Sequence, residues 1–409
     1  MHTLIISAVC LAVYVGMAAG RLPWLSVDRT GIALLGVIAL LASGQATLDD
    51  LGASIDMSTI ALLFGLMIIS AQFVASGFFE ICCDWMLEKA ESPTALLALT
   101  VAVCGALSAL LANDLVVFAM APLLIAGAQG RGLDPRPFLI ALVGASNAGS
   151  SATLIGNPQN ILIGQTGNLN FYSFLGVCLA PALVGLASVF GVVWYLWRDR
   201  IEAASSLTGS GGAEVPRHAH DRNQTIKGLI ALGLLLALFL TKLPREVGAL
   251  VIAAVLLSNR KFTSRAMISS VDWPLLLLFV CLFAVTGVLS NTGLPWSVLS
   301  TLGTPNRLLV LTPLTLLMSN LIGNVPWVIF LLQIWPNPPA GALYALALLS
   351  SLSGGLLLWG SVANLIVAER ARAMGVNLSY AEYARAGVPF TLLSLLFAVI
   401  WLASTGVLS

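Results

Sequence analysis

Two short segments rich in asparagine, glycine and hydroxyl side chains interrupt long apolar runs, and they are the best candidates for chemistry in this sequence. From residue 150 the first reads Ser-Ser-Ala-Thr-Leu-Ile-Gly-Asn-Pro-Gln-Asn, and from residue 354 the second reads Gly-Gly-Leu-Leu-Leu-Trp-Gly-Ser-Val-Ala-Asn. Gly156 matches Gly360 and Asn160 matches Asn364, each 204 positions apart. Unwound backbone at membrane depth is tolerated only where protein or a polar cavity satisfies its polar groups. A matched pair of interrupted membrane helices is typical of a transporter's substrate site.

Two further polar positions stand in the middle of long apolar stretches. Asn113 and Asp114 interrupt residues 94–128, and Asn324 with Pro326 interrupts residues 306–335. Ionisable groups inside a membrane are costly, of the order of 3 kcal/mol on insertion scales, and they face cavities or partners. Asp114 is therefore expected to bind a coupling cation or carry a proton, although it could instead cap the helix that follows. The second stretch carries no acid at the matching position.

Composition excludes a water-soluble enzyme. The chain has 409 residues, of which 58% are hydrophobic and only 9% are charged, and ordinary soluble domains carry about 25% charged residues. A net charge of +1 gives no basic surface for nucleic acid, so no nucleic-acid partner is expected. The six cysteines show no zinc spacing, and no His/Glu metal set or nucleophile–base pair lies at membrane depth. We therefore expect no resident metal and no cofactor, and at most Na⁺ or H⁺ as a coupling ion.

The apolar runs predict an all-α polytopic membrane protein. A bilayer core of about 30 Å needs roughly 20 apolar residues per helix, which gives about 10 transmembrane helices. The stretches at 94–128 and 306–335 fit two re-entrant hairpins better than single spans. The predicted spans are 3–19, 29–44, 57–78, 137–165 (broken), 174–197, 225–241, 246–258, 273–294, 341–369 (broken) and 387–406.

The two halves of the chain align along their length and predict an internal repeat. Residues 1–197 form the first repeat, 198–224 a Gly/Ser-rich linker and 225–409 the second repeat. The matched pairs are Leu22-Pro23 with Leu243-Pro244, Gly31 with Gly248, Asp56 with Asp272, Gly77 with Gly293, and Asn113 with Asn324. Each half holds five spans and one hairpin, and an odd number of spans makes the second half inverted relative to the first. Helix capping is the expected role of Asp56 and Asp272.

Basic residues give the expected orientation. All but three of the 19 lysine and arginine residues fall on the side that contains the linker 198–224; the other three are Lys242, Arg245 and Arg307. By the positive-inside rule the linker is cytoplasmic, both termini lie outside, and the protein is multi-pass in the cytoplasmic (inner) membrane. His218 and His220 lie in the linker, where a solvated role is favoured over metal binding.

The candidate site gathers donors and acceptors from both halves. Amides and hydroxyls can both donate and accept hydrogen bonds, exposed helix N-termini favour anions, and unwound carbonyls favour cations. Close helix packing is the alternative for the small residues. No lysine or arginine is expected at membrane depth near either break, so we expect recognition through amides, hydroxyls and helix dipoles. The candidate residues are Asn113, Asp114, Ser150, Ser151, Thr153, Gly156, Asn157, Pro158, Asn160, Asn324, Pro326, Gly354, Gly355, Gly360, Ser361 and Asn364.

These motifs resemble the ion transporter superfamily, which includes arsenite permeases, citrate and dicarboxylate carriers, and sodium/proton antiporters of related fold. The resemblance covers nearly the whole chain and implies inverted repeats, re-entrant hairpins, a substrate site between hairpin tips and broken helices, and, for several relatives, a dimer with an elevator-like transport domain. Only the asparagines match the Ser-Asn-Thr tips of the sodium–dicarboxylate branch, whereas Ala-Asn-Asp is closer to the arsenite-permease pattern. The resemblance is carried by residues 112–114, 152–160, 323–326 and 360–364.

The sequence therefore predicts a secondary active transporter of a small anion or oxyacid, coupled to sodium or protons and working by alternating access in the lipid bilayer. Two alternatives of the same fold stay open: an arsenite or antimonite efflux permease, and a sodium/proton antiporter without an organic substrate. A membrane-embedded enzyme fits least. No ATP-binding loop is present, so pumping driven by ATP would need a separate subunit.

Overall fold

The computed structural model describes the chain except residues 1, 21–26, 204–219, 242, 302–304 and 409, and it is all helical. Part of the linker 198–224, with His218, and the matched Leu22-Pro23 lie outside the described residues. The helices are α1 (His2–Ala19), α2 (Arg29–Ala42), α3 (Leu48–Ser54), α4 (Met57–Ala75), α5 (Phe78–Lys89), α6 (Pro93–Leu110), α7 (Asn113–Gly130), α8 (Arg136–Ser150), α9 (Pro158–Thr166), α10 (Phe171–Ala203), α11 (Arg222–Leu238), α12 (Arg245–Leu257), α13 (Ser264–Ser269), α14 (Trp273–Ser290), α15 (Leu294–Thr301), α16 (Leu308–Leu321), α17 (Asn324–Ile334), α18 (Ala340–Ser353), α19 (Val362–Ala373) and α20 (Tyr380–Ser404).

Seven of the helices in the described residues are long and apolar enough to cross a membrane: α1, α4, α6, α7, α10, α14 and α20. Four more, α2, α16, α17 and α18, are apolar but shorter, with 10–17 residues. The two long apolar stretches each divide into a helical pair, α6 with α7 and α16 with α17, and each pair is packed together. The chain is thus a multi-pass membrane protein, and four short helices that the hydropathy pattern did not predict (α3, α5, α13, α15) connect its longer ones.

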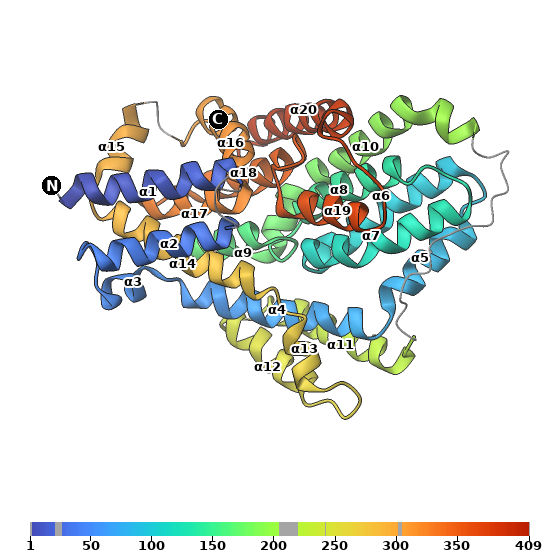
Figure 1. The fold of residues 1–409 in the computed structure, drawn as a ribbon, viewed down its shortest axis with the longest axis horizontal. Coiled ribbons are helices and arrows are strands. Elements are labelled where there is room, and N and C mark those ends of the chain that lie inside the picture. Colours follow the sequence, from blue (N-terminus) through green and yellow to red (C-terminus); the bar gives the residue numbers. More distant parts are fainter. Residues whose placement is uncertain (1, 21–26, 204–219, 242, 302–304, 409) are drawn as a thin grey trace.

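The longer helices are named in two groups by their contacts, and Figure 1 shows α1 and α2 at the left of the molecule with α6, α7 and α10 at the right. We call α1, α2, α4, α11, α12 and α14 the frame helices, because α4 packs on α11 and α12, and α14 packs on α1 and α2. We call α6 to α10 and α16 to α20 the site helices, because α8 packs on α6 and α10, α7 on α19, and α18 on α16 and α20. The groups meet where α17 contacts α14 and where α9 contacts α4.

Matched residues of the two halves begin and end matched helices. Asp56 caps α4 with φ −78° and ψ 89°, and Asp272 caps α14 with φ −77° and ψ 79°. Gly77 and Gly293, just after these helices, both have a φ of 70°, a left-handed conformation that favours glycine. The predicted capping role of both aspartates is confirmed, and equal caps at equal positions give the two helices the same local geometry.

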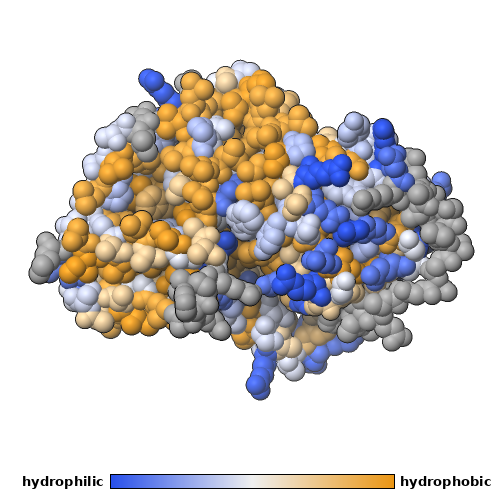
Figure 2. Space-filling model, turned by 45° about the horizontal axis from the view of Figure 1, so that its top comes forward, coloured by the Kyte–Doolittle hydropathy of each residue, from blue (hydrophilic) through white to orange (hydrophobic). Residues whose placement is uncertain are grey.

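The surface has the apolar character that a lipid-facing protein needs. Figure 2 shows apolar side chains over a broad expanse of one face, with hydrophilic side chains gathered toward one end. Large apolar side chains are exposed on helices of both groups, among them Leu11, Val251, Val255, Leu309 and Leu396. Exposed apolar area of this extent marks contact with a membrane or another protein.

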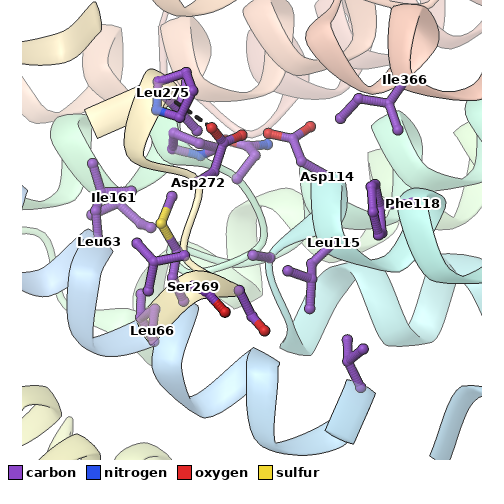
Figure 3. A pocket seen from close by; sticks show the side chains of 18 of the residues that line it. Leu63, Leu66, Asp114, Leu115, Phe118, Ile161, Ser269, Asp272, Leu275 and Ile366 are labelled. Atoms are coloured by element: carbon purple, nitrogen blue, oxygen red, sulfur yellow. Dashed lines mark hydrogen bonds between the residues drawn. The ribbon is translucent and has the colours of Figure 1, made fainter. Parts of the chain in front are cut away.

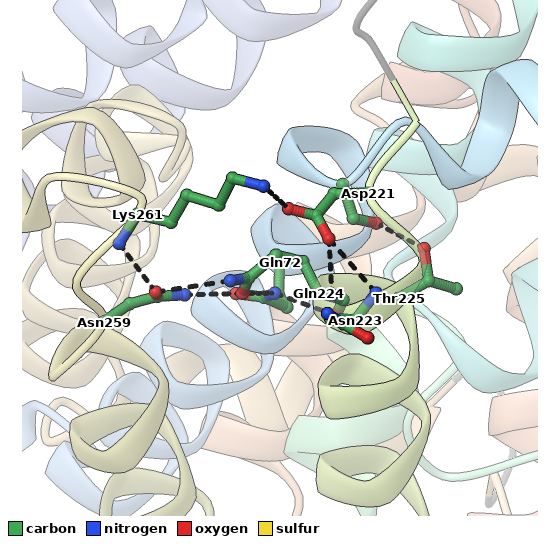
Figure 4. Close-up of polar contacts among 8 residues, drawn as sticks. Gln72, Asp221, Asn223, Gln224, Thr225, Asn259 and Lys261 are labelled. Atoms are coloured by element: carbon green, nitrogen blue, oxygen red, sulfur yellow. Dashed lines mark hydrogen bonds and ion pairs between the residues drawn. The ribbon is translucent and has the colours of Figure 1, made fainter.

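A polar cluster joins the start of the second half to the end of α4 (Figure 4). Asp221 caps α11 by accepting from the N–H groups of residues 223 and 224, and it pairs with Lys261. The Lys261 ammonium holds the pKa of Asp221 below its usual range. Gln72 donates to the Gln224 side chain at 3.1 Å, and Asn259 donates to the same oxygen at 2.6 Å. These bonds fix α11 against α4 and the end of α12, where the described chain resumes after residue 219.

The close approach of α4 and α12 generates a first prediction. A Cβ atom on Gly65 of α4 would lie 2.9 Å from the Ala249 Cβ and 3.0 Å from the Ala249 carbonyl carbon on α12. Gly65→Val should therefore push these helices apart and lower the free energy of unfolding by about 1–3 kcal/mol. Thermal unfolding in detergent measures the change. Gly191→Val, at a glycine of α10 with no atom within 4 Å of its Cβ position, is the control. Equal melting temperatures for the two variants would contradict the prediction.

Candidate functional site

The first break separates α8 from α9. Helix α8 ends at Ser150 and α9 begins at Pro158, whose missing N–H costs nothing at a first helical position. Asn157 caps α9, because its side-chain oxygen accepts from the Asn160 N–H at 2.9 Å. The second break likewise separates α18, which ends at Ser353, from α19, which begins at Val362. Both helices predicted to be broken are broken, and the predicted place of Pro158 is confirmed.

Asn160 and Asn364 satisfy the carbonyl groups that unwinding frees. The Asn160 amide Nδ2 donates to the carbonyl oxygens of residues 150 and 153, at 3.2 and 3.0 Å. The Asn364 amide Nδ2 donates to those of residues 354 and 357, at 2.8 and 2.9 Å. Every acceptor in one break is 204 positions from its counterpart in the other. The two asparagines thus do the same structural work, which leaves their side-chain oxygens for other partners.

Those oxygens are bound by residues of the opposite half. Asn147 of α8 donates to Asn364 Oδ1 at 2.9 Å, and Ser351 of α18 donates to Asn160 Oδ1 at 3.3 Å. Asn147 and Ser351 are themselves 204 positions apart, so the two bonds are reciprocal. Asn157 Nδ2 also donates to Ser351 Oγ at 2.9 Å. Because each break is completed by the other half, the two breaks form one polar centre.

Each helical-pair tip approaches the break of its own half. The Asn113 N–H donates to the Gly156 carbonyl at 3.1 Å. A Cβ atom on Gly354 would lie 3.3 Å from Asn324 Nδ2, so the second tip makes a similar close approach. A side chain at 354 would crowd the Asn324 amide, so glycine at this position permits the close approach of the second tip.

Several buried polar atoms at this centre have no hydrogen-bond partner among the described residues. Asn113 is 3% exposed and Asn320, one turn before the second tip, is 7% exposed; the Oδ1 atom of each lacks a donor. Buried polar atoms in native proteins are nearly always paired, and each exception needs an explanation. The others on the site helices are Ser108 Oγ, Ser146 Oγ, Thr312 Oγ1, Ser319 Oγ, Ser353 Oγ and Thr391 Oγ1. Unused acceptor capacity of this kind is suited to a cation or to a hydroxyl-bearing ligand.

The structure buries every predicted site residue except Asp114, which is partly exposed. The hydroxyl groups of three of them bond to backbone carbonyls: Ser150 to residue 147, Ser151 to residue 148 and Thr153 to Ala109. Ser361 starts α19 without a side-chain cap, and Gly355 offers its carbonyl to the Tyr383 hydroxyl at 2.9 Å. Pro326 is buried in the first turn of α17, and Gly360 faces Asn320. Asp114 also makes no capping bond, since α7 begins without a side-chain cap.

A cavity of about 710 Å³ adjoins the first tip and the first break (Figure 3). Ala112 and Asp114 of the tip line it, as do Asn157 and Pro158 of the break. Across from them lie the start of α14, the end of α19 and the apolar face of α4. The charged lining residues are Asp114, Asp272, Glu369 and Arg370. The cavity is therefore mostly apolar, with acidic groups where tip and frame face each other.

Two arginines lie beside the breaks, against the expectation of a site without basic side chains. The Arg29 guanidinium of α2 donates to the Trp359 carbonyl in the second break at 3.4 Å, and it lies 3.5 Å from the Cβ position of Gly323 at the second tip. Arg370 lines the cavity and stacks on Phe118, 3.5 Å from the ring centroid. The expectation was wrong because Arg29 begins α2, which is far from the second break in sequence, and only tertiary packing brings it there.

The model of a citrate transporter family matches residues 12–337, well over half of the chain. The chain belongs to this citrate transporter family. It is thus a membrane transporter rather than an enzyme, as the sequence predicted, and the resemblance of the chain to the ion transporter superfamily is confirmed.

Similarity to known transporters covers almost the whole chain. An uncharacterized transporter of Mycobacterium tuberculosis is 31% identical, covering 92% of this chain and 94% of the relative. The silicon efflux transporter LSI3 of Oryza sativa subsp. japonica is 27% identical, covering 90% and 91%. The crystal structure of the YdaH transporter of Alcanivorax borkumensis has a TM-score of 0.57 at 16% identity, covering 99% of this chain and 98% of that one, and so shares the fold.

The sequence did not predict four residues of this citrate transporter family member that lie at the site. Arg29, Asn320 and Ser351 lie at the breaks, and Asp272 lies on the cavity wall. Two of them had a signal. Ser351 stands 204 positions after Asn147, and Asn320 stands one helical turn before Asn324. Arg29 had none that a single sequence can give. Asp272 was recognised only as a cap.

The two matched glycines of the breaks generate a second prediction. A Cβ atom on Gly156 would lie 2.4 Å from the Ser150 carbonyl oxygen and 2.8 Å from that of Ser108, both backbone atoms. On Gly360 the nearest atom is Oδ1 of the Asn320 side chain, at 2.5 Å, and the nearest backbone atom is the Gly354 carbonyl oxygen, at 3.0 Å. Gly156→Ala should therefore lose about 1–3 kcal/mol of stability and Gly360→Ala clearly less. Thermal unfolding of both variants in detergent measures this, and an equal or larger loss for Gly360→Ala would overturn it.

Proposed function

We propose that this protein is a secondary transporter that carries a small oxyacid or its anion across the cytoplasmic membrane, driven by sodium ions or protons. The observation that carries the proposal is the reciprocal pair of breaks with unpaired buried amide oxygens beside them, on Asn113 and Asn320. A centre built this way can exchange ligands without unfolding, because its own carbonyls are already satisfied by Asn160 and Asn364.

The residues divide into those that shape the site and those that bind. Asn160 and Asn364 hold the breaks open, and Asn147 and Ser351 lock them to each other. Binding falls to the tips, with Asn113 in the first half and Asn324 in the second, and to the start of α19. That helix begins at Ser361 without a side-chain cap, and helix N–H groups free of a cap are suited to an oxygen anion.

The site also fits a particular membrane topology. In this proposal the halves are inverted repeats, α6–α7 and α16–α17 are re-entrant hairpins that enter from opposite faces, and both termini lie outside with the 198–224 linker in the cytoplasm. The distribution of lysine and arginine supports it, as do the equal caps of α4 and α14. Alternating access then consists of movement of the site helices against the frame helices.

The charge of the cavity favours a small oxyacid over a polycarboxylate. Its charged lining residues are three acids and one arginine, and that arginine is stacked on an aromatic ring. A multiply charged anion would meet like charges there, whereas an uncharged or singly charged oxyacid would not. One relative is a silicon efflux transporter, and for this reason metalloid efflux is the second candidate function.

Flux into proteoliposomes tests the proposal directly. Silicic acid, arsenous acid and citrate are offered in turn under an imposed sodium gradient or pH gradient. We expect one oxyacid to accumulate only when a gradient is present. Resistance of a metalloid-sensitive host would separately identify efflux of arsenite or antimonite. Cation-driven pH changes in everted vesicles with no effect of any oxyacid would overturn the proposal in favour of a sodium/proton antiporter.

Asp114 gives a third prediction. Its carboxylate is the one ionisable group that either tip contributes, and it lines the cavity without capping α7. Asp114→Asn should abolish or uncouple transport, because an amide cannot take up a proton and holds a cation poorly. Insertion into the membrane should be unchanged, as shown by yield and thermal unfolding of the purified variant. Full gradient-driven transport by Asp114→Asn would remove Asp114 from the mechanism.

Arg29 gives a fourth prediction. The guanidinium beside the second tip and second break is placed to bind an oxygen of the substrate. Arg29→Gln should then raise the KM for the transported oxyacid by about tenfold, the loss expected for one hydrogen bond to a charged group. Arg29→Lys keeps the charge and should fall between that variant and the natural protein. Unchanged KM values in both variants would leave Arg29 a structural role only, as a donor to the Trp359 carbonyl.

A further inference from the structure

Asp272 differs from its counterpart Asp56 in one respect that capping does not explain. Both carboxylate oxygens of Asp56 are occupied: one accepts from the Thr59 N–H at 3.1 Å and the other from the Thr59 hydroxyl at 2.6 Å. At Asp272 one oxygen accepts from the Leu275 N–H at 3.0 Å. Leucine has no hydroxyl group, so the second oxygen accepts no hydrogen bond from the described residues. The two caps have the same backbone geometry and unequal chemistry.

The unoccupied oxygen of Asp272 belongs to a carboxylate that faces the carboxylate of Asp114 across the cavity (Figure 3). Asp114 makes no hydrogen bond or ion pair that the structure describes. Asp114 stands at the tip of the site helices, and Asp272 begins a frame helix. The two carboxylates therefore meet where the two helix groups meet.

The elements that wall this space contribute few charged side chains. Helix α4 contributes apolar residues, α13 contributes Ser269 and Ser270, and α9 contributes Pro158 and Ile161. Helix α19 contributes Glu369 and Arg370. The Arg370 guanidinium lies over Phe118, and Glu369 has a partner of its own. Within the described part of the lining, acids outnumber bases by three to one, so the facing carboxylates need an added cation.

We propose that Asp114 and Asp272 bind one small cation, a proton or Na⁺, between the site helices and the frame helices. This deepens the proposed function, on which it rests, by naming a second coupling residue and the place where the ion acts. With the cation bound, one positive charge joins the two carboxylates and the first tip can lie against the start of α14. Without it, two like charges face each other in a mostly apolar cavity and favour separation of the groups. Ion occupancy would thus bias the relative position of the two groups.

Cation-dependent thermal unfolding of the purified protein, without any substrate, tests the pair. The melting temperature is measured against NaCl, with KCl and choline chloride as controls for ionic strength, and separately against pH without sodium. A bound cation stabilises the native state, so the natural protein should melt higher with sodium or at lower pH. The arm that responds identifies the ion.

Substitutions then locate the response. Asp272→Asn should weaken the apparent affinity for the responding cation by about tenfold or more. Asp56→Asn, at the matched cap whose oxygens are both occupied, should leave it unchanged. Leu275→Thr supplies at Asp272 the hydroxyl that Thr59 supplies at Asp56, and it should also weaken the affinity while keeping the cap. The double variant Asp114→Asn/Asp272→Asn should lose no more affinity than the stronger single variant.

The outcomes are separable from those of the transport assay. A titration of Asp272→Asn and Leu275→Thr indistinguishable from that of the natural protein would overturn the pair, even if oxyacid transport is observed. The absence of any stabilisation by sodium or protons in the natural protein would overturn it equally. If no oxyacid is transported but the titration depends on Asp114 and Asp272 as stated, the pair stands and the substrate proposal fails.

Discussion

The structure depends on one constraint. Where two helices are interrupted inside an apolar protein, the backbone carbonyl groups that lose their helical partners need other hydrogen-bond donors. In each break one asparagine supplies the donor, because its amide nitrogen donates to two carbonyls of that break. Leaving one such group without a partner costs about 1–3 kcal/mol, so four of them would rival the whole stability of many proteins. Asn160 and Asn364 therefore decide that a polar centre can exist here at all.

Onto this symmetric base the chain adds asymmetric charges. The first tip carries Asp114 and faces Asp272, whereas the second tip carries Val325 in place of the acid and lies beside Arg29. Two equal halves would give two equal sites, and the ion and the substrate of the proposed function would then have no reason to bind at different ones. Opposite charges at the two tips give each its own preference. The matched residues build the two breaks, and the unmatched charges beside the tips make the two ends of the site different.

Sequence predicted the long helices, both breaks and the caps, because apolar length, proline placement and the 204-residue match are local or repetitive signals. It missed α3, α5, α13 and α15, which are too short or too polar to stand out in a hydropathy pattern. It also missed the part played by Arg29, Ser351 and Asp272. Their roles depend on tertiary neighbours: a break more than 300 residues away, a reciprocal partner, and a leucine where the other half has threonine.

The reciprocal bonds between the breaks also bear on how the protein is made. Ser351 and Asn364 are synthesised long after Asn147 and Asn160, and chains are built at about 5–20 residues per second. For that interval, roughly ten to forty seconds, the first break lies in the membrane without the partners that complete it. Until the second half is synthesised, Asn147 and Asn160 therefore lack the partners that they have in the finished protein. If the chain were cut between its halves, each fragment would hold one break without the partner that the other half supplies. The two fragments would then have to assemble for the polar centre to form.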